Sequence, residues 1–185
     1  MKKGLRMKEL DKFKKNNCTC EECTSYCERT PGWFRPKEIP LLAEFLKMSI
    51  QEIYEQYLIV DFWAGNSSNI YVLTPVKDFE RLKKSTDSIQ RETAKLFFET
   101  RSLLDARQDQ DKAGSCASWG YAFWRGPCVF LKEGKCAIYS VRPFECAIAH
   151  HKKKTPKNMR ELILREWRND PLIETLLNRR IKKGG

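Results

Sequence analysis

Residues 126–146 read GPCVFLKEGKCAIYSVRPFEC, and this stretch decides the fold more than any other part of the chain. Two short apolar arms flank Gly134, which predicts a small hairpin with Cys128 and Cys136 on its two arms. Pro143 breaks the chain after the hairpin, and Cys146 follows it closely. The stretch therefore predicts a compact turn region that carries cysteines.

A second group of cysteines lies near the N-terminus. From Cys18 to Cys27 the chain follows C-x-C-x2-C-x3-C, a spacing that suits zinc and iron–sulfur sites because backbone amides can turn toward the thiolates. The density of Cys, Thr, Ser, Pro and Gly over residues 18–35 predicts an irregular loop around a metal. Long gaps separate the other cysteines, so these thiols reach one metal only through tertiary folding: Cys116, Cys128, Cys136 and Cys146.

The expected compartment determines how these thiols are interpreted. The 185 residues contain no stretch near the roughly 20 consecutive apolar residues of a membrane span. The first residues, MKKGLRMKELDKFKKNN, lack the apolar segment and cleavage site of a signal peptide, so we expect a cytoplasmic protein without membrane contact. Cytosolic thiols are kept reduced, so the eight cysteines predict metal binding or redox chemistry, and disulfides are the weaker interpretation.

The number of candidate ligands exceeds what one tetrahedral zinc ion needs. We favour one site that leaves some cysteines in the core, with Cys18 and Cys116 as the bystanders, over two separate sites. His150 lies four residues after Cys146 and is a further candidate ligand, although both histidines also fit a charged surface run, HHKKK. Arg142 is a candidate N–H donor that would support the ligands from outside the metal's coordination sphere.

Apolar spacing predicts the elements around the cysteines. A helical hairpin is expected from Pro40 to Leu58, with Ser49 and Glu52 as the capping box of its second helix. A strand over residues 69–76 and a helix over 85–108 follow, then a helix from Thr155–Pro156 through Trp167 and a short one from Asp170–Pro171.

These elements predict an α+β fold: a small, mostly helical single domain with a short hairpin and irregular cysteine-rich metal-binding loops. Its parts are a basic segment over residues 1–17, a cysteine-cluster domain over 18–151, and a basic helical extension over 152–185 packed on the same domain.

The net charge of +11 lies at the two ends of the chain. Residues 1–17 carry +5 and residues 150–185 carry +7, whereas residues 18–149 carry −1. Solvated helical faces explain such ends, so we expect nucleic-acid binding to be unlikely, although a basic nucleic-acid-binding adaptor stays an alternative. An acidic protein or redox partner would fit the same charges.

The chain resembles the YkgJ-type cysteine-cluster family, which is described as a zinc- or iron-chelating domain and sometimes as iron–sulfur oxidoreductases. The resemblance covers most of residues 20–147 and is strongest from Gly126 to Cys146. It also includes the helical hairpin, IPLLAEFLKMSIQEIYEQYL. It implies a mixed, mostly helical metal-binding domain whose ligands are Cys20, Cys23, Cys27, Cys128, Cys136 and Cys146. Family members usually have two adjacent cysteines where this chain has Cys23-x3-Cys27, so one ligand is missing or replaced by Cys18 or Cys116.

Three functions from different classes fit these observations. The first is an iron–sulfur or iron protein with a redox or accessory role, whose cofactor is a 4Fe-4S cluster. The second is a structural-zinc interaction module, and the third is the nucleic-acid adaptor. We favour iron because the thiols are many and because aromatic residues would shield them: Trp119, Tyr121, Phe123, Trp124, Phe130, Tyr139 and Phe144. The glycines form no phosphate loop or dinucleotide fingerprint, so nucleotide cofactors are not expected.

Overall fold

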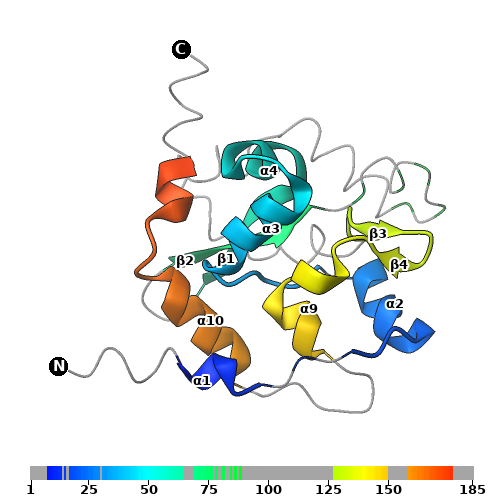
Figure 1. Ribbon diagram of the computed structural model, residues 1–185, viewed down its shortest axis with the longest axis horizontal. Helices are drawn as coiled ribbons and strands as arrows, with labels where there is room; N and C mark the ends of the chain where they lie inside the picture. The colour runs from blue at the N-terminus through cyan, green and yellow to red at the C-terminus, as the bar shows by residue number, and fades with distance from the viewer. Residues whose placement is uncertain are drawn as a thin grey trace.

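The computed structural model describes residues 8–13, 15, 17–29, 31–64, 69–76, 78, 81, 84, 86, 88, 127–149 and 158–176 (Figure 1). Helices and two small antiparallel sheets confirm the predicted α+β class. The elements in chain order are α1 (Lys8–Asp11), α2 (Glu21–Arg29), α3 (Glu38–Leu46), α4 (Ile50–Tyr57), β1 (Leu58–Ala64), β2 (Asn69–Pro75), β3 (Leu131–Lys132), β4 (Lys135–Cys136), the 3-10 turn η2 (Tyr139–Val141), α9 (Phe144–Ile148) and α10 (Met159–Trp167). A further helical turn covers residues 172–176.

The predicted helical hairpin is present as α3 and α4. The backbone of Lys47 ends α3 in the left-handed region, with φ of 54°, and turns the chain toward the second helix. Ser49 and Glu52 then form the predicted capping box, in which the Ser49 side chain accepts a hydrogen bond from the Glu52 amide. Ile39, Leu42 and Ile53 are fully buried between these helices and the core.

A two-stranded sheet follows the hairpin directly, and the sequence interpretation identified only one of its strands. The strand predicted over residues 69–76 is β2, but β1 begins at Leu58, where the end of a helix was expected. The β-branched and aromatic run LIVDFW explains the change, because such residues favour a pleated surface. The strands pair from Leu58 opposite Pro75 to Ala64 opposite Asn69.

The segment that precedes α3 is fixed to the edge of β2. The amide of Phe34 donates to the carbonyl of Leu73 at 2.9 Å, and the buried Thr74 hydroxyl donates to the carbonyl of Gly32 at 3.0 Å. Phe34 and Leu73 are both fully buried. This edge therefore holds residues 31–34 in an extended path through the middle of the protein.

Helix α10 covers this segment and connects it with the N-terminal helix. The indole N–H of Trp167 donates to the carbonyl of Phe34 at 2.7 Å. The Arg35 guanidinium is buried and contacts Glu166 on α10 and Asp11 on α1, at 2.5 Å and 2.7 Å. Leu10 is also buried, so α1 belongs to the same hydrophobic core as α10.

The ends of the predicted C-terminal helices can be compared with the structure. Helix α10 ends at Trp167 as predicted, but it begins at Met159 with Asn158 at the N-cap, later than expected. The expected start at residues 155–156 lies outside the described residues, as does nearly all of the helix predicted over 85–108. Asp170 caps the last turn through a hydrogen bond from the Leu172 amide, as predicted. Over the described residues, no helix has the length and apolar character to cross a membrane.

Candidate metal centre

The N-terminal cysteines lie on a helix, which corrects the sequence interpretation. Residues 18–35 were expected to be an irregular loop, but residues Glu21–Arg29 form α2. Two acidic residues in the first turn, Glu21 and Glu22, favour a helix start, and this signal was outweighed by the Thr, Ser and Cys content. Because Cys23 and Cys27 are four residues apart on α2, they lie on one face, one turn from each other.

The C-terminal cysteines lie around the predicted hairpin, which is confirmed. Strands β3 and β4 pair antiparallel, and Glu133 and Gly134 both have positive φ, 49° and 71°, as a tight hairpin turn of this type requires. Cys136 lies on β4, Cys128 lies three residues before β3, and Cys146 lies on α9. Figure 1 shows α2 beside the hairpin at the right of the protein and α9 between α2 and α10, and α2 contacts β4.

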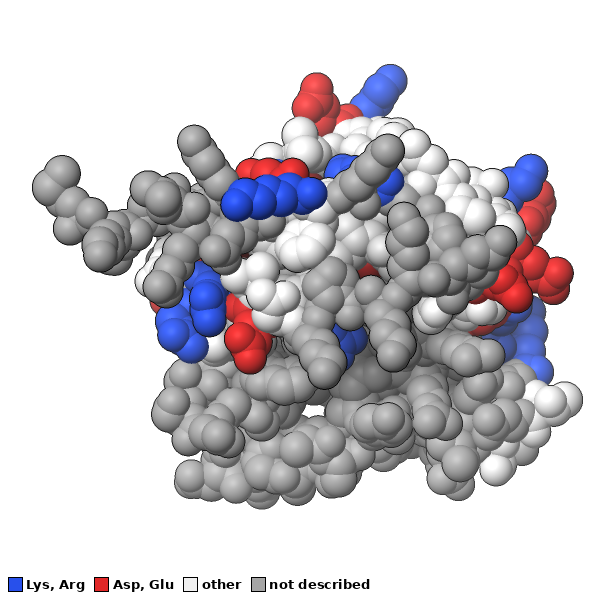
Figure 2. Space-filling view, turned by 90° about the horizontal axis from the view of Figure 1, so that it is seen from below, with Lys and Arg blue, Asp and Glu red and all other residues white. Residues whose placement is uncertain are grey.

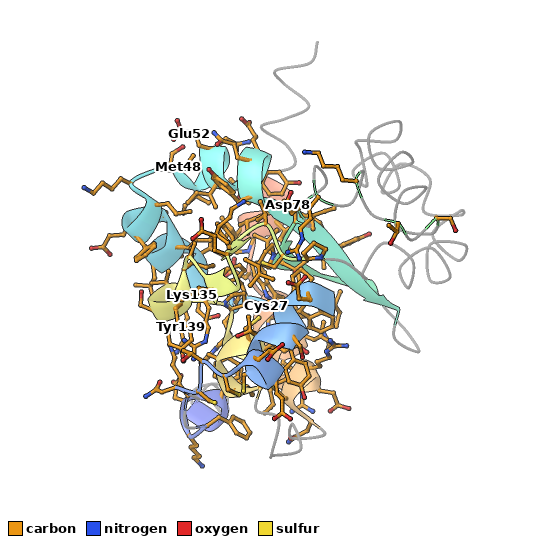
Figure 3. All side chains as sticks on the ribbon, turned by 90° about the vertical axis from the view of Figure 1, so that its right-hand side faces the viewer. Cys27, Met48, Glu52, Asp78, Lys135 and Tyr139 are labelled. Carbon is orange, nitrogen blue, oxygen red and sulfur yellow. The ribbon has the colours of Figure 1, made fainter. Side chains whose placement is uncertain are left out.

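Residues of these three elements line one cavity of about 310 Å³, and cysteines from both groups are among them. In Figure 3, Cys27 lies on α2 beside the segment that carries Lys135 and Tyr139. Five of the six predicted ligands line the cavity, and Cys18 lines it as well. Cys20 is exposed and is not among the lining residues described, which include Cys18, Cys23, Cys27, Cys128, Cys136 and Cys146.

Backbone hydrogen bonds join the two groups of cysteines. The amide of Cys128 donates to the carbonyl of Cys27 at 2.8 Å. The next amide, that of Val129, donates to the carbonyl of Val76 at 2.9 Å, which extends the β2 edge to the cavity. The positions of Cys27 and Cys128 are therefore set by the fold and not by a metal alone.

Cys146 is held by the extended segment 31–34. The amide of Gly32 donates to the Cys146 sulfur at 3.2 Å, and a Cβ added at Gly32 would lie only 2.7 Å from that sulfur. The neighbouring Glu145 carboxylate accepts hydrogen bonds from the Trp33 amide at 3.0 Å and from Arg160 at 2.6 Å. The sequence interpretation missed Gly32 and Glu145, because no local pattern connects residues more than 110 positions apart.

Four of the cysteines that line the cavity, called the inner thiols below, are Cys27, Cys128, Cys136 and Cys146. Burial has the largest effect on the pKa of each of them. It raises the pKa of Cys27 to about 11 and that of Cys128 to about 12. Burial also raises the pKa of Cys136, and it raises that of Cys146 well above its ordinary value. Neighbouring thiolates add to the effect for Cys27, Cys128 and Cys146, since like charges in one site repel each other. A cation in the cavity would favour the charged forms of all four.

Arg142, expected to support the ligands, lines the same cavity. Its guanidinium donates to the carbonyl of Tyr139 and lies over the Tyr139 ring, 3.7 Å from the centroid. Its charge opposes the effect of burial and lowers the pKa of Cys27 and Cys136. Arg142 is therefore a fixed positive charge beside two of the inner thiols.

The other three described cysteines, Cys18, Cys20 and Cys23, are called the outer thiols, and they lie closer together. The sulfur atoms of Cys18, Cys20 and Cys23 all lie within 4.8 Å of one another, close enough to hold a metal ion. A backbone hydrogen bond from Cys23 lowers the pKa of Cys20, and the Cys18 side chain adds to this effect. Cys20 directly precedes α2, and a helix N-terminus stabilises thiolate charge.

Some predicted site residues lie outside the described residues or away from the cavity. Cys116 and His150 are outside them, and so are four of the predicted shielding aromatics, Trp119, Tyr121, Phe123 and Trp124. Phe130 and Tyr139 do line the cavity. Phe144 is buried in the core instead, where its ring packs edge-on against Phe13 and under the Arg35 guanidinium.

The described surface shows charges of both signs. On the face seen in Figure 2, acidic and basic side chains lie next to each other and form no continuous patch of one sign among the described residues. Surface ion pairs, such as that of Lys37 with Asp11 at 2.7 Å, also join charges of opposite sign.

Comparisons with protein family models, with curated proteins and with solved structures found no match to this chain. The resemblance to the YkgJ-type family therefore stays a prediction. The capacity to bind metal is inferred from the cysteines themselves.

Proposed function

We propose that the cavity holds an iron–sulfur cluster bound by Cys27, Cys128, Cys136 and Cys146, and that the protein has a redox or accessory role. The observation that carries this proposal is the convergence of these four thiols, from α2, the hairpin region and α9, on one cavity. Four cysteine thiolates are the usual ligand set of both 2Fe-2S and 4Fe-4S clusters.

The spacing of the thiols supports a cluster over a single ion. A tetrahedral zinc ion with Zn–S bonds of about 2.3 Å places its sulfur atoms about 3.8 Å apart. Among the described residues, three ligand atoms within 4.8 Å of one another occur only in the outer group, so the inner four are spread more widely. A void for one water needs roughly 10–15 Å³. The 310 Å³ cavity therefore has room for much more than one ion.

The surroundings of the thiols also suit a cluster. Phe130 and Ile138 give the cavity apolar walls, and Arg142 supplies a positive charge. The Gly32 amide donates to the Cys146 sulfur. Hydrogen bonds to sulfur, nearby charge and solvent exclusion are the features that set cluster reduction potentials. A bound cluster supplies one-electron transfer, and these residues would tune it.

A reducing compartment is part of the proposal. None of the seven cysteines that the structure describes forms a disulfide, and thiols are kept reduced in the cytoplasm, the location we propose. We infer that a protein partner, acidic enough to meet the basic ends of the chain, exchanges electrons with the site or receives its cofactor.

The test is the metal content of protein purified without oxygen. We expect brown protein with broad absorbance near 400 nm, as cysteine-bound clusters generally show, and iron together with inorganic sulfide. Cys136→Ser should lose most of both, whereas Cys20→Ser, a matched exchange outside the cavity, should keep them. Stoichiometric zinc without iron or sulfide in the wild-type protein would contradict the proposal and favour the structural-zinc module.

A further inference from the structure

The outer thiols have the spacing of a mononuclear site. Their sulfur atoms lie within 4.8 Å of one another, near the roughly 3.8 Å separation that tetrahedral thiolate zinc requires. Each separation therefore exceeds that value by no more than about 1 Å. The inner four thiols do not meet this spacing, so the two groups suit different metal species.

The backbone around these three cysteines favours the thiolate forms that bind a metal. Cys20 directly precedes α2, its carbonyl accepts the Thr24 amide at 3.0 Å, and Cys23 lies in the first turn. Amides at a helix start point toward the sulfurs and stabilise their negative charge. Cys18, two residues before Cys20, is the third member of the group. Three thiolates on one short stretch need no distant part of the chain to come together.

The group is positioned at the rim of the cavity. Cys18 and Cys23 line the cavity, but Cys20 is exposed to solvent and does not. Among the described residues, no fourth Cys, His, Asp or Glu joins the three within the same distance. A fourth coordination position is therefore left for solvent or another ligand, as in zinc sites that keep three protein ligands and one open position.

We infer that Cys18, Cys20 and Cys23 form a second metal site, which binds one thiophilic divalent cation of the zinc type at the rim of the cavity. The open position and the exposed ligand make this ion exchangeable, in contrast to a cofactor enclosed by the inner thiols. The inference is independent of the proposed cluster, because its ligands and its geometry are separate. It also gives Cys18 a role, whereas the sequence interpretation had treated Cys18 as a bystander.

The experiment measures zinc, iron and sulfide in the same anaerobic samples of full-length protein. Each sample is incubated with zinc, passed over a desalting column and analysed. We expect about one zinc per wild-type chain. In a zinc titration of the same samples, Cys20→Ser should weaken zinc binding at least a hundredfold, beyond the roughly 10–100-fold loss typical of a residue that only supports a ligand. Its iron and sulfide should not change. Serine is itself a good N-cap residue, so α2 should persist in this variant.

Cys136→Ser is the reciprocal variant, and it should keep its zinc while it loses iron and sulfide. Wild-type zinc binding in Cys20→Ser, repeated in Cys18→Ser, would overturn the second site. Loss of iron and sulfide in Cys20→Ser would overturn it as well, because it would show one shared site. Zinc uptake that depends on Cys20 in a wild-type protein without iron would support the second site while contradicting the proposed cluster.

Discussion

Gly32→Ala should reduce both the stability of the protein and its capacity to hold a metal through Cys146. The new Cβ would lie 2.7 Å from the Cys146 sulfur, 2.9 Å from the Cys146 backbone nitrogen and 3.0 Å from the Cβ of Glu145. The sulfur could rotate away, but the backbone nitrogen belongs to α9 and cannot. The methyl group therefore forces residues 31–34 and α9 apart.

The magnitude follows from the cost of overpacking. One extra carbon in a well-packed interior costs about 1–3 kcal/mol. The hydrogen bond from the Gly32 amide to the Cys146 sulfur would lengthen as well, which adds about 0.5–1 kcal/mol of lost interaction. With a urea m-value of about 2 kcal/mol/M, a total of about 1.5–4 kcal/mol lowers the unfolding midpoint by about 0.8–2 M.

The assay is urea unfolding of metal-free protein, together with iron and sulfide content after anaerobic purification. Gly134→Ala is the matched control, because Gly134 also lines the cavity. A Cβ there meets nothing within 4 Å, although the positive φ of 71° disfavours alanine by roughly 1–2 kcal/mol. The control should lose some stability but keep its metal.

Iron and sulfide at wild-type levels in Gly32→Ala, with an unchanged urea midpoint, would refute the reasoning. An equal loss of metal in both variants would also count against it, because metal loss would then follow general destabilisation and not the displacement of Cys146.

Further variants test other contacts. Glu166→Gln should destabilise the protein by about 1–3 kcal/mol in urea unfolding, because buried Arg35 loses a charged partner. Ser49→Ala should cost about 1 kcal/mol through the lost cap but leave metal content unchanged. Arg142→Gln should lower iron content at neutral pH, since the positive charge beside the thiols is removed. Asp11→Asn should cost about 0.5 kcal/mol at neutral pH. That cost should fade as pH falls below 3.8, because hydrogen bonds from Lys37 and Arg35 hold the folded pKa of Asp11 below this value.

The sequence predicted those parts of the fold that local chemistry determines. The capping box at Ser49, the hairpin around Gly134 and the cap at Asp170 each depend on residues within a few positions of one another. Strand β1 was missed because it follows α4 directly, with no turn residue between Tyr57 and Leu58, and because Leu58 also fits the apolar spacing of the helix. Helix α2 was missed because its composition resembles that of a loop, although its acidic first turn indicated a helix start.

The candidate site was predicted as a set of residue types but not as an arrangement. Clustered cysteines indicated metal chemistry, yet their division into a close outer group and a more widely spaced inner group around the cavity depends on tertiary structure. Gly32 has no motif around it, and its role is visible only once α9 packs against residues 31–34. Contacts of this kind depend on the path of the whole chain, which local patterns do not contain.

The contact between Gly32 and Cys146 joins positions 114 residues apart, and this separation imposes an order of events during synthesis. Ribosomes add roughly 5–20 residues per second, so about 6–23 s pass between the appearance of the two residues. For most of that interval the N-terminal cysteines exist without Cys128, Cys136 and Cys146, which appear at its end. The cavity is thus completed only after Cys146 has been synthesised, and a cell that delivers its cofactor must do so after that point.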